Sequence, residues 1–168
     1  MNGLYILSVW VHILAAIVWI GGMLFLVLVV VPWLRKGGRV DAGIFLRETG
    51  ERFSKVGWVC FGLVLVTGTF NLWFRGVRLS DFTSAEWLQS PFGKTVVVKL
   101  SAFVLVLIVS AVHDFVVGPR ATRAIEADAR SEQAGRERRR ASMLGRVNVL
   151  LALILVAAGV MLVRGVPW

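Results

Sequence analysis

The chain has 168 residues, of which 57% are hydrophobic, and it carries a formal net charge of +9. This composition excludes an ordinary soluble globular domain, because several apolar runs are long enough to cross a hydrocarbon core of about 30 Å. The lone Cys60 excludes an internal disulfide and any C-x-x-C metal or redox motif. The positive charge needs no nucleic acid, since it is concentrated where membrane topology and anionic lipid would place it.

Four apolar runs predict transmembrane helices over residues of about 4–32, 56–74, 95–117 and 144–163. A lipid-exposed strand would require a closed barrel, and these runs lack the alternating polarity of barrel strands. We therefore predict an all-α integral membrane four-helix bundle. Residues 1–168 are expected to form a single transmembrane domain.

Two of the connections between these runs, about 34–55 and 118–142, are rich in Lys and Arg. The positive-inside rule predicts that both are cytoplasmic. The segment 75–94 has fewer basic residues and holds Trp87 and Pro91, as expected for an outer turn. Both termini then lie outside, and the predicted location is the inner membrane of a bacterial-type cell.

The only two histidines lie inside apolar runs, His12 in the first and His113 in the third. An ionisable side chain at membrane depth is a functional-site hypothesis by default, because holding it there costs free energy. Helical spacing puts Trp19 and Met23 on the stripe of His12. Lys99 shares a stripe with His113 on the third predicted helix.

A weak internal repeat relates the two halves of the chain. Shifts of about 87 or 88 residues pair His12 with Lys99, Pro32 with Pro119, Ser54 with Ser142 and Gly57 with Gly145. This pattern predicts two pseudo-repeated helical hairpins, related by an axis along the membrane normal. Chance is the alternative explanation, because the identities are few.

Depth along the helices separates two polar layers. His12 and Lys99 both fall in the outer half of the bilayer, whereas His113 falls about 20 Å below Lys99. One flat cofactor therefore cannot easily take both histidines as axial ligands. The predicted outer layer contains His12 and Lys99, and the predicted inner layer contains Met23 and His113.

The chemistry of these layers suits a metal or a haem. Neutral imidazole binds haem iron or copper, and thioether sulfur is a soft partner for either. A b-type haem would explain a cation at membrane depth, since its propionates need Lys or Arg partners. We predict His12 as axial ligand, Lys99 as propionate or substrate anchor and Trp19 beside the cofactor. His113 and Met23 are weaker metal-ligand candidates, and helix-packing hydrogen bonds are the alternative role for both histidines.

The string HILAAIVWIGG from His12 resembles the opening of copper-resistance-D-like membrane domains. The strings VKL around Lys99 and HDFVVGPR from His113 resemble short stand-alone members of that group. The His12 and Lys99 combination is also similar to the haem-binding protoporphyrinogen oxidases of the HemJ type, in which such residues are functional. The chain departs from that oxidase by having Val112 before His113 instead of the paired Tyr-His. It also lacks a Met- or His-rich periplasmic loop that would receive copper.

Three functions are therefore compared. The main prediction is a membrane redox protein that binds haem b and performs electron transfer or porphyrinogen or quinone-linked oxidation, as a candidate membrane oxidoreductase. The first alternative is transport of copper or another metal across the inner membrane, with copper in place of haem. The second is a non-catalytic accessory subunit of a larger membrane complex. The expected partners are membrane lipid, a quinone or porphyrin, and either a second copy or other subunits of a membrane complex.

Overall fold

A computed structural model describes residues 2–36, 42–128 and 130–165 of the chain. This described part is helical and contains no strand. Four of its helical segments are long and apolar enough to cross a membrane: Gly3–Trp33, Arg47–Phe74, Pro91–Ala127 and Glu132–Arg164. The predicted all-α architecture with four such helices is confirmed.

The first segment consists of α1 (Asn2–Phe25), a π-helical turn η1 (Leu26–Val30) and α2 (Val31–Lys36). It is followed by α3 (Ala42–Phe74), which begins well before the apolar run predicted from residue 56. The added residues include good helix formers such as Glu48 and Glu51 and no proline, so the helix continues beyond the apolar run. Residues 37–41 of the predicted first connection lie outside the described residues.

Two short helices, η2 (Leu79–Thr83) and α4 (Ala85–Gln89), connect α3 to the third segment. The Ser84 side chain caps α4 by accepting from the Trp87 backbone N–H, and Ser90 caps the next helix by accepting from Gly93. Pro91 then occupies the first helical position, where its missing N–H has no cost. This capping explains why the third helix begins at residue 91 and not at 95.

The second half repeats the pattern of the first. It consists of α5 (Pro91–Val112), a second π-helical turn η3 (His113–Val117), α6 (Gly118–Ala127) and α7 (Glu132–Arg164). The Ser131 side chain caps α7 by accepting from the Ala134 N–H, so this helix also starts before its apolar run. The polar first turns of α7 therefore extend the bundle beyond its apolar part.

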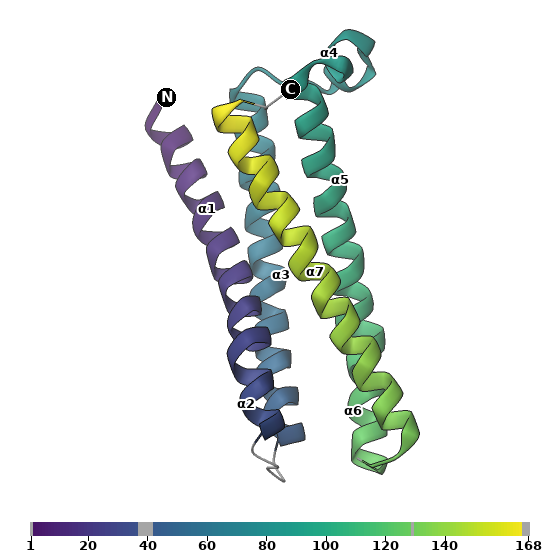
Figure 1. The fold of residues 1–168 in the computed structure, drawn as a ribbon. Coiled ribbons are helices and arrows are strands. Elements are labelled where there is room, and N and C mark those ends of the chain that lie inside the picture. Colours follow the sequence, from purple (N-terminus) through teal and green to yellow (C-terminus); the bar gives the residue numbers. More distant parts are fainter. Residues whose placement is uncertain (1, 37–41, 129, 166–168) are drawn as a thin grey trace.

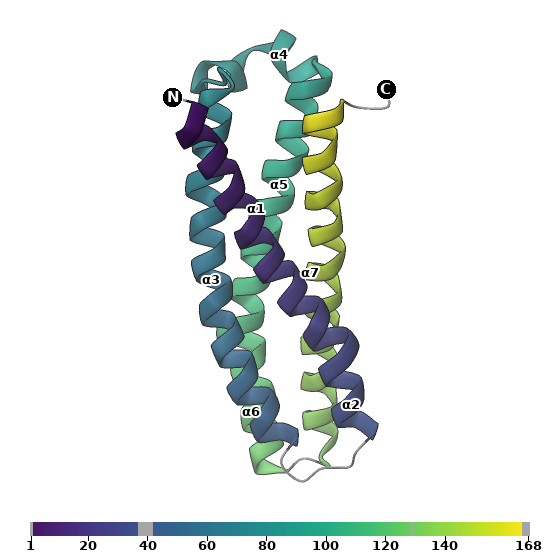
Figure 2. The ribbon, with the colours of Figure 1, turned by 90° about the vertical axis from the view of Figure 1, so that its left-hand side faces the viewer.

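The helices pack as two hairpins, α1 against α3 and α5 against α7. The start of α1, the end of α7 and the short helix α4 lie at one end of the bundle, which we call the α4 end (Figure 1). The tips of α2 and α6 lie at the opposite end, which we call the basic end (Figure 1). Seen from the side, α1 starts beside α3 at the α4 end and crosses the bundle obliquely towards the basic end (Figure 2).

The two π-helical turns occupy equivalent positions in the two hairpins. Leu26 and His113, which open η1 and η3, are separated by 113 − 26 = 87 residues, the same shift that pairs Pro32 with Pro119. Each turn is closed by a backbone bond across five residues, from Val31 N–H to the Leu26 carbonyl and from Gly118 N–H to the His113 carbonyl. A proline ring crowds the carbonyl four residues before it, and in both hairpins that carbonyl lies inside the wider π turn. The equivalence supports the two-hairpin repeat.

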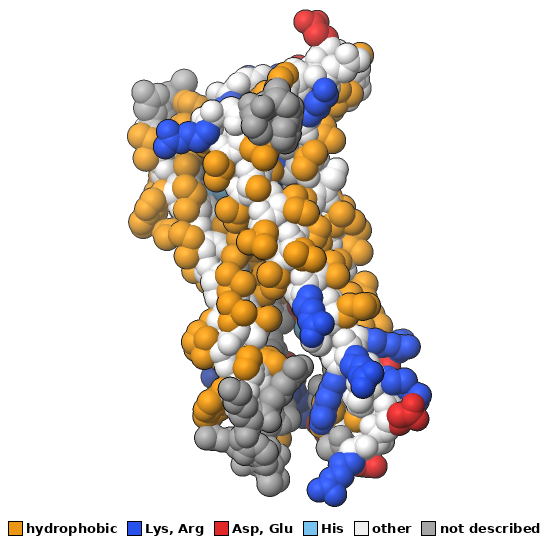
Figure 3. Space-filling model, viewed as in Figure 1, with side chains coloured by type: hydrophobic (Ala, Val, Ile, Leu, Met, Phe, Trp, Pro, Cys, Tyr) orange, Lys and Arg blue, Asp and Glu red, His pale blue; other side chains and the backbone are white. Residues whose placement is uncertain are grey.

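The surface of the bundle suits a lipid environment. Many large apolar side chains are exposed around its middle, including Val66 at 68% and Leu150 at 61%. In the space-filling view, hydrophobic side chains cover the middle of the molecule, and Lys and Arg side chains gather over α6 and the start of α7 (Figure 3). The buried core is narrow and rich in small residues, such as Ala15 and Ala152, which allow close helix packing.

Candidate functional site

His12 is oriented by a hydroxyl on the neighbouring helix of its hairpin. Its Nδ1 lies 2.9 Å from the Thr67 Oγ1, and that hydroxyl donates its own proton to the Leu63 carbonyl at 2.6 Å. The hydroxyl oxygen can therefore only accept from His12, which assigns the ring proton to Nδ1. The lone pair of Nε2 is left available for a metal ion or a proton. Sequence reasoning missed Thr67, because its role depends on which helix packs against α1.

The side chains of His12 and Lys99 each pack against a glycine of the other long helix in the same hairpin. A Cβ built at Gly68 of α3 would lie 3.2 Å from His12 Cε1, and one at Gly159 of α7 would lie 3.6 Å from Lys99 Nζ. Each ionisable side chain thus packs on a bare stretch of backbone in its own hairpin. His12 lies in the first half of α1 and Lys99 in the first half of α5, so both lie in the half of the bundle nearer α4.

Trp19, Met23 and Cys60 lie in the buried core between the two histidines. They are 7%, 7% and 4% exposed and belong to one apolar cluster with Phe61. The Trp19 ring makes an edge contact with Phe61, with ring centroids 5.0 Å apart. The indole therefore has a packing role in this structure, and its predicted contact with a cofactor stays a prediction. The two sulfur atoms provide soft donors in an otherwise apolar region.

His113 is oriented by a carboxylate that three donors hold in place. Its Nδ1 lies 2.9 Å from Asp114 Oδ1, while Asp114 Oδ2 accepts from the Ser54 hydroxyl at 2.5 Å and from Trp58 Nε1 at 3.2 Å. A carboxylate can only accept, so His113 Nδ1 carries a proton, and Nε2 is the ring nitrogen that Asp114 leaves free. The third helix stays continuous here, as its lack of an internal proline or glycine predicts, but it widens into η3. The His113 side chain is 37% exposed and is therefore accessible.

The two histidines therefore share one arrangement in different parts of the bundle. In each, Nδ1 is engaged by an oxygen atom, supplied by Thr67 or Asp114, so the lone pair of the neutral ring lies on Nε2. Histidines that bind metals through one ring nitrogen almost always donate the other N–H to such an oxygen, which fixes the tautomer and the ring orientation. Only the position of each acceptor in the fold reveals this pattern.

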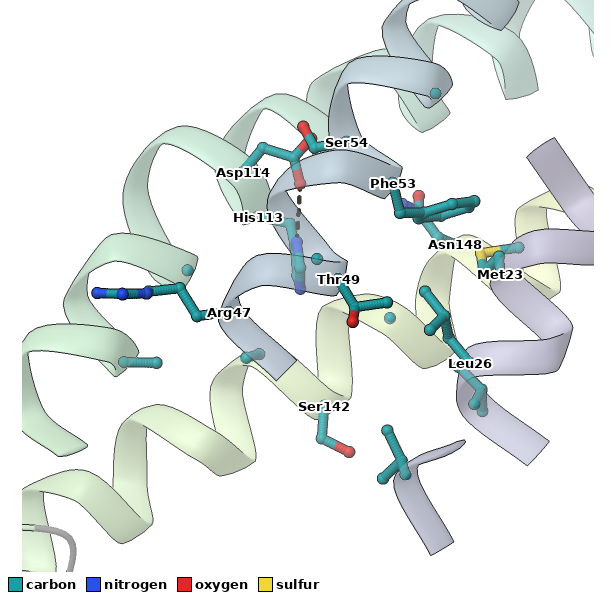
Figure 4. Close-up of a pocket in the computed structure, with 18 of the residues that line it drawn as sticks. Met23, Leu26, Arg47, Thr49, Phe53, Ser54, His113, Asp114, Ser142 and Asn148 are labelled. Carbon is teal, nitrogen blue, oxygen red and sulfur yellow. Dashed lines mark hydrogen bonds and ion pairs between the residues drawn. The ribbon is translucent and has the colours of Figure 1, made fainter. Parts of the chain in front are cut away.

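Beside His113 lies a large cavity, which we call the basic-end cavity. It has a volume of about 840 Å³ and lies between the two hairpins, with Met23, Leu26, Phe53, His113, Ser142 and Asn148 among its lining residues. Figure 4 shows Met23 and Leu26 on one side of this cavity and His113, bonded to Asp114, on another. Asn148 donates through Nδ2 to the Ser110 hydroxyl at 3.0 Å and so joins α7 to α5 at its deep end.

Residues that the internal repeat pairs are found together in the lining of this cavity. The pairs Met23 with Ser110, Ser54 with Ser142 and Gly57 with Gly145 all line it. The π-helical turns η1 and η3 each contribute lining residues, from equivalent positions of the two hairpins. The cavity therefore lies between equivalent parts of the two hairpins.

Within the described residues, no group of three or more His, Cys, Asp or Glu side chains could together hold a metal ion. The donors lie one or two at a time along the bundle, as His12, Cys60 with Met23, and His113. Such sparse nitrogen and sulfur donors suit a soft ion that accepts few ligands, such as cuprous copper. They do not suit a closed structural site of the zinc type, which needs four ligands.

Comparison with known proteins gives a family and two relatives. The profile of a family described as copper resistance protein D matches residues 47–162, from α3 to near the end of α7, and leaves out α1. A protein of Aquifex aeolicus described as uncharacterized is 32% identical over 155 residues, which are 92% of this chain and 92% of that protein. The copper transport protein CutJ of Bacillus subtilis is 31% identical over 108 residues, which are 64% of this chain and 18% of CutJ. No solved structure matches the chain.

Proposed function

The chain belongs to the copper resistance protein D family, and we propose that it carries copper ions across a membrane. The similarity to CutJ, a copper transport protein, supports a copper substrate, although the aligned region is only 18% of that protein. The observation that carries the proposal is the shared state of the two histidines. In both, Nδ1 contacts an oxygen atom, so the neutral ring presents its lone pair on Nε2, at different depths of a bundle whose exposed middle is apolar.

Copper would move between these nitrogen donors by way of the buried sulfur atoms. His12 Nε2 is the binding group near the α4 end, and Cys60 and Met23 are the soft donors in the core. His113 Nε2 is the binding group beside the basic-end cavity, from which the ion can leave. Lys99 in its charged form would lower the affinity of the His12 site for a cation and so shorten its residence there, because like charges repel. Transport requires binding that is strong enough to admit the ion and weak enough to release it.

We retain the predicted orientation as part of this proposal. The basic connections face the cytoplasm, both termini face outwards, and the membrane is the inner membrane of a bacterial-type cell. The basic-end cavity then opens towards the cytoplasm. Whether copper enters or leaves the cell follows from the direction of its gradient and any partner proteins.

The predicted haem b redox chemistry receives no support from the family match or from CutJ. The relation to the HemJ-type oxidases is likewise not shown, and quinone and porphyrin stay unsupported as partners. A role as an accessory subunit remains the alternative that requires neither copper nor haem.

Copper flux into proteoliposomes tests the proposal. Purified protein is reconstituted, and the uptake of cuprous copper is followed with a trapped chromophoric chelator. We expect His12→Ala, Met23→Leu and His113→Ala each to lower the initial rate at least tenfold. Met143→Leu is the matched control, because Met143 is 59% exposed on α7 and should leave the rate unchanged.

Equal flux through wild-type, empty and variant vesicles would reject copper transport. An absorption spectrum of the same preparation separates the alternatives. A Soret band that disappears in His12→Ala would restore the haem reading, and the absence of both haem and copper flux would favour the accessory subunit.

A further inference from the structure

The basic-end cavity is too large to be explained by a copper ion alone. Its volume of about 840 Å³ is far greater than the space that one ion and its ligand atoms occupy. The volume falls within the range of about 300–1,000 Å³ that is typical of pockets for small organic molecules. The site is therefore able to receive an organic ligand, independently of whether copper passes His113.

The walls of the cavity are mainly apolar. Leu26 and Val27 of η1, Phe53 of α3 and Ile125 of α6 contribute side chains from separate elements. Two lining positions on the long helices have no side chain: a Cβ built at Gly50 or at Gly145 would meet no atom within 4 Å. The cavity can therefore take an apolar body without rearrangement of the helices.

A stripe on α7 supplies uncompensated positive charge to the same cavity. Arg138, Ser142, Gly145 and Arg146 follow the spacing of one helix face, and all of them line the cavity. Within the described part of the chain, neither Arg138 nor Arg146 makes an ion pair.

The other charged groups that line the cavity are already paired. Arg47 bonds Glu126 at 2.7 Å, and the Asp114 carboxylate is held by Ser54, Trp58 and His113. The unpaired guanidinium groups are therefore suited to a carboxylate or a phosphate, which arginine binds through paired hydrogen bonds.

We propose that the basic-end cavity binds an amphipathic organic anion, whose acidic group lies at Arg138 and Arg146 and whose apolar body lies against Leu26 and Phe53. Basic pockets between transmembrane helices commonly hold the head groups of anionic lipids. A soluble amphipathic acid has the same chemistry and could enter from the basic end. The proposal does not rest on copper transport, because the arginines and the apolar wall are separate from the histidine nitrogens.

Binding by the full-length protein in phosphatidylcholine nanodiscs tests this proposal with two probes. Naphthyl phosphate represents a soluble anion and is measured by calorimetry. Phosphatidylglycerol represents an anionic lipid and is measured by native mass spectrometry against phosphatidylcholine. Binding of the soluble probe alone, or of the lipid alone, supports the site and identifies the source of the ligand. Binding of neither probe overturns the proposal.

Two independent changes remove the site, each with a matched control on α7. Arg138→Gln/Arg146→Gln removes the positive charge at the cavity and should weaken probe binding at least tenfold. Its control, Arg136→Gln/Arg139→Gln, removes the same amount of charge away from the cavity and should change probe binding less than twofold. Gly145→Leu fills the cavity with the arginines intact and should also weaken binding at least tenfold. Its control is Gly135→Leu, which fills open space outside the cavity.

Both leucine substitutions replace a helical glycine by a better helix former, so these variants should fold. Equal binding by the site variants and their controls would overturn the proposal.

Discussion

Replacing Thr67 with valine tests whether the orientation of His12 matters for copper binding. Valine keeps the branched shape of threonine but removes the Oγ1 that accepts from His12 Nδ1 at 2.9 Å. The part-buried Nδ1–H then loses this acceptor, which costs about 1–3 kcal/mol. If the ring moves its proton to Nε2, the lone pair moves to Nδ1, away from the position proposed for copper.

The expected effect on copper affinity follows from this loss of orientation. Removing the partner that orients a metal-binding histidine typically weakens metal binding about 10–100-fold. This corresponds to about 1.4–2.7 kcal/mol of binding free energy. We expect Thr67→Val to weaken cuprous copper binding at His12 by this factor, measured by competition with a chromophoric chelator on a His113→Ala background that isolates the His12 site.

Thr69→Val is the matched control for this experiment. Thr69 lies two residues further along α3, donates to the Leu65 carbonyl at 2.8 Å and is exposed. Thr69→Val removes a hydroxyl from the same helix that does not contact a histidine. The copper affinity of this variant should therefore equal that of the parent protein. Equal affinities in Thr67→Val and Thr69→Val would refute the argument that Thr67 prepares His12 for a metal.

The remaining predictions concern the second histidine, the glycines and the orientation. Asp114→Asn should weaken copper binding at the neighbouring histidine at least tenfold in the same competition assay and leave the His12 site unchanged, because the amide is a weaker acceptor than the carboxylate. Gly68→Ala should weaken copper binding severalfold, since its Cβ at 3.2 Å displaces the imidazole, whereas Gly159→Ala at 3.6 Å makes an ordinary contact and should not. On a cysteine-free background, a cysteine at Leu79 should react with an impermeant thiol reagent in intact cells and one at Arg139 should not; the reverse pattern would contradict the proposed topology.

The sequence alone determined the fold class, because length and apolar content of a segment are local properties. A run such as 95–117 can satisfy its backbone in lipid only as a helix, whatever its neighbours are. The shift of 87 residues was also visible in the sequence, through Pro32 and Pro119, whereas the π-helical turn near each proline was found only in the structure. Helix starts were less accurate, since the capping by Ser90 and Ser131 acts outside the apolar runs.

Only the tertiary structure decided what the polar residues contact. His12 was found by its unusual depth, but its partner Thr67 is 55 residues away and is one of several hydroxyls in α3. Asp114 adjoins His113 in the sequence, yet the hydrogen bonds that it accepts from Ser54 and Trp58 depend on how α3 packs beside η3. The cavity beside them has no local signature, because it arises where two hairpins separate. Composition and periodicity determine which segments form helices, whereas the packing of those helices decides which side chains their polar residues contact.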